Sequence, residues 1–109
     1  MAEKIRVLKT KDNTSTVCIE MRSPTVLLSN VSIYEAEKIF ERREEREYKT
    51  DRKMDFKRCR VVLHYAALSG ARLKKMYNED ANLHFVFEFA TSERAMFFSE
   101  GLKERIGEF

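Results

Sequence analysis

The segment Leu83–Ile106, LHFVFEFATSERAMFFSEGLKERI, contains the two clearest patterns of the chain and decides its fold class. Its first part, Leu83–Ala90, alternates apolar and polar residues, which is typical of a strand with one buried face. A helix follows, capped by Thr91 or Ser92, with apolar residues at helical spacing. These are Ala95, Phe98, Leu102 and Ile106. We therefore expect a strand that leads directly into a helix packed on the same sheet.

Three more strands are expected before the first helix. Lys4–Lys9 and Ser15–Arg22 flank a polar turn and look like a hairpin, since Ser15–Arg22 alternates apolar and polar residues. Ser23-Pro24 then interrupts the pattern, and Thr25–Ser29 supplies a short apolar strand.

The first helix is expected to begin at about Ile33. Ser32 and Glu35 have the spacing of a capping box, in which the serine hydroxyl accepts a hydrogen bond from the amide of Glu35. The helix becomes almost wholly charged toward Lys53. After it, Phe56–Ala67 alternates and predicts a long strand, and Ala71–Tyr77 fits either a strand or a helical turn.

These segments predict an α+β domain, with an antiparallel sheet of about five to six strands and two helices packed on it, in the order βββα-βββα. Leu83–Ile106 also resembles the end of a pleckstrin-homology-like domain, in which an aromatic strand leads into a C-terminal amphipathic helix. This resemblance implies an alternative fold, a barrel with a C-terminal helix. It also implies an alternative function, the recognition of acidic lipid head groups or peptides.

Length and composition suit one folded unit. The chain has 109 residues, of which 43% are hydrophobic and 11% aromatic. We expect residues 1–109 to form a single domain. The first residues lack the apolar core of a signal peptide, and no apolar run reaches the roughly 18 residues of a membrane span. A cytoplasmic or nuclear protein with no membrane span is expected.

Basic residues are concentrated in the middle of the chain. Arg52–Lys75 holds eight basic residues and one acidic residue, whereas the chain from Glu79 onward holds three basic and seven acidic residues. Cations with interleaved aromatic rings suit phosphates and unstacked bases. We therefore predict a non-enzymatic regulatory module that contacts nucleic acid through a basic strand pair, residues 57–75. The predicted contacts are Lys57, Arg58, Arg60, Arg72, Lys74, Lys75 and Tyr77.

Two other interpretations of the charges stay open. Basic residues on exposed strands also serve as ordinary solubilising or edge-protecting charges. In the charged helix 33–53, glutamates alternate with cations and would repel phosphates, which favours a protein partner. The alternative function is thus a protein-protein interaction module, such as an adaptor, inhibitor or homodimer, that uses this helix and an open sheet edge. Its predicted contacts are Arg43, Glu44, Arg46, Glu47 and Tyr48.

The sequence gives little support to an enzyme. No glycine-rich phosphate loop, metal-binding spacing or nucleophile motif is present. His64 and His84 are the general-base candidates, and they could lie close together if their strands pair. Cys18 and Cys59 fall inside apolar runs, where thiols are buried and poorly reactive. We expect no cofactor, no metal ion and no small-molecule substrate.

Overall fold

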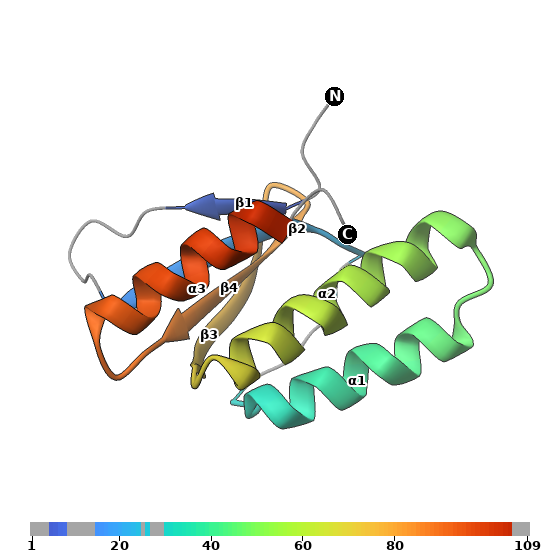
Figure 1. Cartoon of the computed structure of the whole chain (residues 1–109). Coiled ribbons are helices and arrows are strands. Elements are labelled where there is room, and N and C mark those ends of the chain that lie inside the picture. The colour runs from blue at the N-terminus through green and yellow to red at the C-terminus, as the bar shows by residue number, and fades with distance from the viewer. Residues whose placement is uncertain (1–4, 9–14, 25, 27–29, 106–109) are drawn as a thin grey trace.

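The computed structural model describes residues 5–8, 15–24, 26 and 30–105 (Figure 1). Two strands precede a helical hairpin, and a second pair of strands leads into the last helix. In chain order the elements are β1 (Ile5–Leu8), β2 (Thr16–Arg22), α1 (Ile33–Arg46), α2 (Thr50–Leu68), β3 (Arg72–Glu79), β4 (Asn82–Glu88) and α3 (Ser92–Arg105).

The four strands form one antiparallel sheet in the order β1-β2-β4-β3. β2 pairs with β4 across the middle, so that Ile19 lies opposite Phe85 and Glu20 lies opposite His84. The α+β class is confirmed. The sheet is open, with β1 and β3 as its edges, so the barrel alternative is wrong.

The predicted five to six strands and the order βββα-βββα are also wrong for the described residues, which follow the order ββααββα. The predicted strand Thr25–Ser29 lies outside the described residues, apart from Val26.

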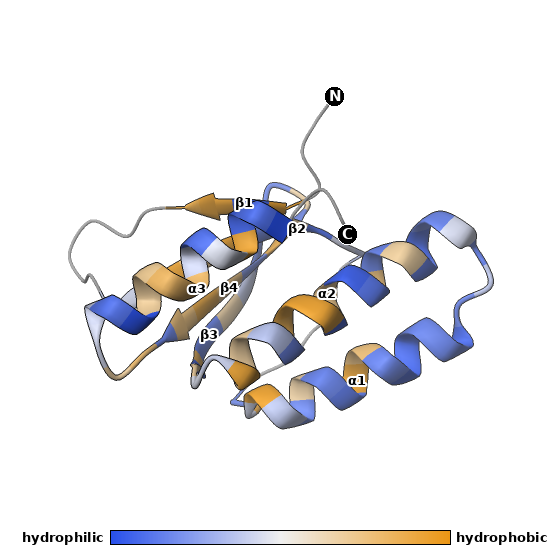
Figure 2. Ribbon diagram, in the orientation of Figure 1, coloured by the Kyte–Doolittle hydropathy of each residue, from blue (hydrophilic) through white to orange (hydrophobic). Residues whose placement is uncertain are grey.

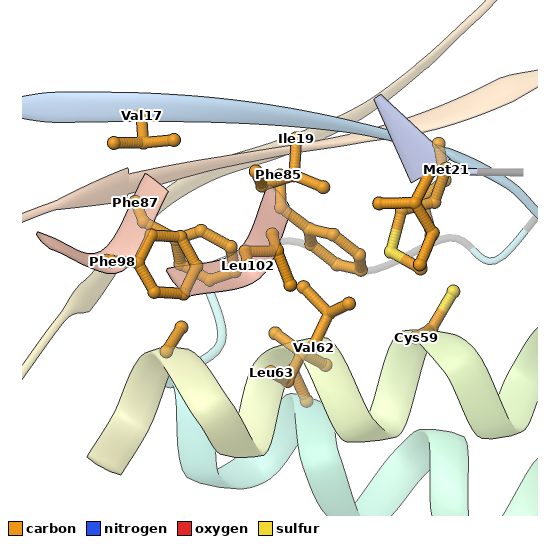
Figure 3. Packing of buried hydrophobic residues seen from close by; sticks show 14 of the residues in the cluster. Val17, Ile19, Met21, Cys59, Val62, Leu63, Phe85, Phe87, Phe98 and Leu102 are labelled. Carbon is orange, nitrogen blue, oxygen red and sulfur yellow. The ribbon is translucent and has the colours of Figure 1, made fainter. Parts of the chain in front are cut away.

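All three helices pack on one face of the sheet, which we call the inner face. Its side chains come from alternate positions of the central strands and interdigitate with residues of α2 and α3 (Figure 3). Aromatic rings dominate the contact: the ring centroid of Phe98 lies 5.6 Å from that of Phe87, and Phe40 of α1 reaches within 6.0 Å of Phe85. Such edge-to-face pairs stabilise a core beyond the area they bury.

The prediction of a strand at Phe56–Ala67 is wrong, because these residues lie in α2. Cys59 and Leu63 satisfy an alternating pattern and a helical pattern equally well, so alternation alone does not distinguish the two. The buried stripe follows helical spacing from Phe56 to Ala66. The helix spans 19 residues, longer than ordinary strands, and its Lys, Arg, Met, Ala and Leu residues favour a helix.

Both predicted helix starts are confirmed. The Ser32 hydroxyl accepts a hydrogen bond from the amide of Glu35 at 3.1 Å, and α1 begins at the next residue, Ile33. The Thr91 hydroxyl accepts from the amide of Arg94 at 3.2 Å at the start of α3. Each contact satisfies an amide that the first turn of a helix leaves without an internal partner.

The β3–β4 hairpin turns through Asp80 and Ala81, both with positive φ, at 51° and 65°. Positive φ at both central residues is the geometry of a type I′ turn, which favours Asp-Gly or Asn-Gly. Ala81 therefore carries a Cβ in a left-handed conformation that glycine adopts without strain.

We expect Ala81→Gly to raise the free energy of unfolding by about 0.5–1 kcal/mol, because it relieves this strain by more than the added backbone entropy costs. Urea denaturation of the two proteins measures the difference. The matched control Ala90→Gly, outside the turn, should not stabilise. A destabilised Ala81→Gly protein would contradict the assigned turn.

Cys59 of α2 is completely buried beneath the sheet. Burial raises the pKa of its thiol from 9.0 to about 12. The folded state therefore holds the thiol proton more tightly than the unfolded state does. Its contribution to stability is complete below pH 9 and is lost as the pH rises toward 12.

We expect the free energy of unfolding to fall by about 1.4 kcal/mol between about pH 8 and about pH 10 through this thiol, since the unfolded chain ionises there and the folded chain does not. Denaturation at both pH values should show the fall in the wild-type chain, in excess of any fall in Cys59→Ala. Equal falls in the two proteins would show that Cys59 does not carry this dependence.

Candidate nucleic-acid interface

The predicted nucleic-acid contacts lie on two different elements. Lys57, Arg58 and Arg60 are on α2, which packs on the inner face of the sheet, whereas the remaining four residues are on β3. The predicted strand pair at residues 57–75 is therefore wrong in its first half.

Two arginines of α2 form ion pairs inside the helical hairpin, one within α2 and one with α1. Arg58 is 8% exposed and its Nη1 lies 3.0 Å from Oδ1 of Asp55, one turn earlier on the same helix. Arg60 Nε lies 2.8 Å from Oε2 of Glu44 on α1, and this hydrogen bond raises the pKa of the Arg60 guanidinium. Removing one partner of a buried pair leaves an uncompensated charge, so Arg58 has a structural role. Lys57 is exposed on the same helix.

A β-bulge gathers the cations of β3 on the outer face of the sheet, opposite the helices. Arg72 pairs with Glu88 and Lys75 with Val86, and the register shifts between Leu73 and Lys75. Without the extra residue Lys74, Arg72 and Lys75 would point to opposite faces, because side chains alternate along a strand. The bulge therefore places Arg72, Lys75 and Tyr77 on one face. We call Arg72, Lys74, Lys75, Tyr77 and His84 the β3 surface.

Tyr77 stacks on His84 in the middle of this face. Their ring centroids are 4.8 Å apart and their planes are inclined by 15°. The Lys75 Nζ lies 4.9 Å from the Tyr77 ring centroid. On the far side, His84 Nε2 lies 3.0 Å from Oε2 of Glu20, and Glu20 Oε1 lies 3.3 Å from Nε of Arg6. One series of contacts thus crosses all four strands.

The Tyr77 hydroxyl and the neighbouring Cys18 thiol are uncharged. Burial raises the pKa of the Tyr77 hydroxyl, and a hydrogen bond to Cys18 raises it further. Burial likewise raises the pKa of the Cys18 thiol, so both groups are protonated at neutral pH. His84 is 4% exposed, and its Nδ1 has no hydrogen-bond partner among the described residues. Such a buried nitrogen is costly without a partner.

Acidic residues balance part of the β3 surface. Glu88 forms ion pairs with Arg72 and with Lys74, the latter at 4.0 Å between Nζ and Oε2. Lys75 lies over an aromatic ring instead of a carboxylate. A groove of about 600 Å³ runs beside β3, lined by Asn30–Ser32 on one side and residues 72–76 on the other. The three cations of β3 therefore line a groove at this edge, and the Tyr77–His84 pair lies outside its lining.

The predicted protein contacts lie where α1 turns into α2, at the hydrophilic end of the helical hairpin (Figure 2). Two of them hold the hairpin: Glu44 pairs with Arg60, and Glu47 pairs with Arg52 at 3.6 Å. Arg43 and Arg46 belong to the last turn of α1, and Tyr48, in the connection, is 88% exposed.

The strand pairing that could have brought the two histidines close together does not exist, because His64 lies on a helix. His64 lies on α2, where its Nδ1 is 2.8 Å from Oε1 of Glu37 on α1, whereas His84 lies on the outer face of the sheet. Each imidazole has a glutamate partner that is distant in sequence, which spacing could not reveal. In the described part of the chain, no three His, Cys, Asp or Glu side chains converge as metal ligands.

No helix among the described residues combines the length and the apolar character needed to cross a bilayer.

Comparisons with known proteins do not assign a family. No protein-family model, no curated protein and no solved structure matches this chain.

Proposed function

We propose that this chain is a non-enzymatic regulatory module that holds single-stranded nucleic acid on the β3 surface. The observation that supports this most is the bulge at Lys74, which turns Arg72 and Lys75 toward the same face as the Tyr77–His84 stack. A cytoplasmic or nuclear location fits such a ligand.

The chemistry of the surface matches that of a single strand. Cations attract the phosphates, and the partly exposed ring of Tyr77, which stacks on the buried His84, offers an aromatic contact for an unstacked base. No described helix covers this face, because all three pack on the inner one. A four-stranded antiparallel sheet with helices behind it is also a geometry that proteins use to read single-stranded RNA. Glu88 limits the affinity, since it competes with phosphate for Arg72 and Lys74.

A second candidate is a protein partner at the end of the helical hairpin. Tyr48 is 88% exposed there, beside Arg43 and Arg46. Exposed tyrosine and arginine side chains are typical anchors of protein interfaces. Glu44 and Glu47 would then act by holding the hairpin in shape.

We expect Lys74→Glu/Lys75→Glu to weaken binding of a fluorescent 12-nucleotide oligo(U) or oligo(dT) at least tenfold, because the variant replaces two attractions with repulsions. Fluorescence anisotropy measures the affinity. The matched control is Lys53→Glu/Lys57→Glu, which makes the same charge change on α2, and it should bind within about twofold of the wild-type chain. Equal losses in both variants would place the interaction elsewhere or show attraction by net charge alone.

The salt dependence gives a second test of the same surface. Three phosphate contacts on a single strand predict a slope of about −2 for the logarithm of the binding constant against the logarithm of salt concentration. The Lys74→Glu/Lys75→Glu variant should have a distinctly shallower slope. A wild-type affinity that does not respond to salt would rule out phosphate contacts by these cations.

A further inference from the structure

Two large apolar side chains are exposed beside one groove, away from the β3 surface. Leu68, the last residue of α2, is 75% exposed, and Phe97 of α3 is 61% exposed. Both line a groove of about 350 Å³, whose floor includes Tyr65 and Phe98. Single exposed apolar residues are common on proteins, but two that flank one concave site mark an interaction surface.

The packing of α3 fixes the direction of Phe97. The adjacent Phe98 is buried, with its ring centroid 5.4 Å from that of Tyr65. Phe97 is one position away on the helix and therefore cannot share that buried site. Arg94 lines the same groove, and its Nη1 lies 3.1 Å from the position that a Cβ on Gly70 would occupy.

The charges of α3 are arranged symmetrically about Phe97. Arg94 lies three residues before it and Glu100 three residues after it, and both are exposed. If two copies of α3 pack antiparallel with Phe97 at the crossing point, Arg94 of each copy lies opposite Glu100 of the other. A two-fold interface repeats every contact, so this arrangement forms two ion pairs from one. Two copies of this surface can therefore pair with opposite charges facing each other and with Phe97 in the apolar centre.

We propose that a second copy of this chain covers the surface formed by Leu68, Arg94, Phe97 and Glu100, which makes a two-fold dimer through antiparallel α3 helices. Each Phe97 packs against the groove beside Leu68 of the other copy. Two apolar side chains per copy and two exposed ion pairs stabilise such an interface weakly, so the dimer forms at concentrations on the order of 10 µM. This inference does not depend on the nucleic-acid proposal, because the β3 surface lies on the other face of the sheet.

Charge exchange tests the two-fold arrangement directly. Arg94→Glu and Glu100→Arg should each weaken dimerisation at least tenfold, because each places like charges opposite one another. An equimolar mixture of the two variants should dimerise again. In the mixed pair the substituted positions carry opposite charges and face each other, and the unchanged Arg94 of one chain faces the unchanged Glu100 of the other. The double variant within one chain should also recover. Sedimentation velocity from about 1 to about 300 µM, a range that brackets the expected dissociation constant, measures all of these samples and the wild-type chain.

Two further variants separate the interface from folding. Phe97→Glu should be monomeric over the same range, while Tyr34→Glu, the same change at an exposed aromatic residue on α1, should dimerise like the wild-type chain. Thermal unfolding by circular dichroism confirms that each variant is folded. A monomeric wild-type chain throughout the range would overturn the proposal. So would a dimer that Arg94→Glu and Glu100→Arg leave unchanged, or a mixture that does not recover.

Discussion

The antiparallel pairing of β2 with β4 is the constraint on which the rest of the structure depends. It joins two hairpins that the chain separates by the α1–α2 hairpin, and its register sets both faces of the sheet together. Ile19 opposite Phe85 builds the inner face on which the helices pack, while Glu20 opposite His84 builds the outer one. A slip of one residue would bury Glu20 and expose the phenylalanines. Burial of the apolar inner face therefore fixes the register that places Glu20 opposite His84 on the outer face.

The outer face then depends on an irregularity at the β3 edge. With regular alternation, the side chains of Arg72 and Lys75 would point to opposite faces of the sheet. The bulge at Lys74 places both on the same face as Tyr77. Bulges and lysines also protect edge strands from pairing with other chains. Edge protection and ligand binding are compatible. A β3 edge that does not pair with another strand remains accessible to a ligand that binds through phosphate contacts and ring stacking.

The parts of the fold that local sequence determines were predicted, and the parts that depend on distant contacts were not. The strand at Leu83–Glu88 and the caps at Ser32 and Thr91 follow from spacing over a few residues, and all are confirmed. Phe56–Ala67 satisfies two periodicities at once, and the helix is favoured by its length, by its residue types and by its packing against the sheet. That error placed Lys57, Arg58 and Arg60 on the wrong element. The candidate site shows the same division: the stack of Tyr77 on His84 requires the hairpin register, and the members of the Glu20–His84 pair lie 64 positions apart.

We propose that nucleic acid binds on the outer face of the sheet, at β3 and β4. The most direct measurement is a titration of ¹⁵N-labelled protein with a short unlabelled single strand of about eight nucleotides, within the site sizes of such surfaces, followed by amide chemical shifts. We expect the amide chemical shifts to change at Arg72–Tyr77 and around His84, and to stay unchanged in α1 and α2. Shifts confined to the connection around Tyr48, or no shifts at millimolar oligonucleotide, would contradict it.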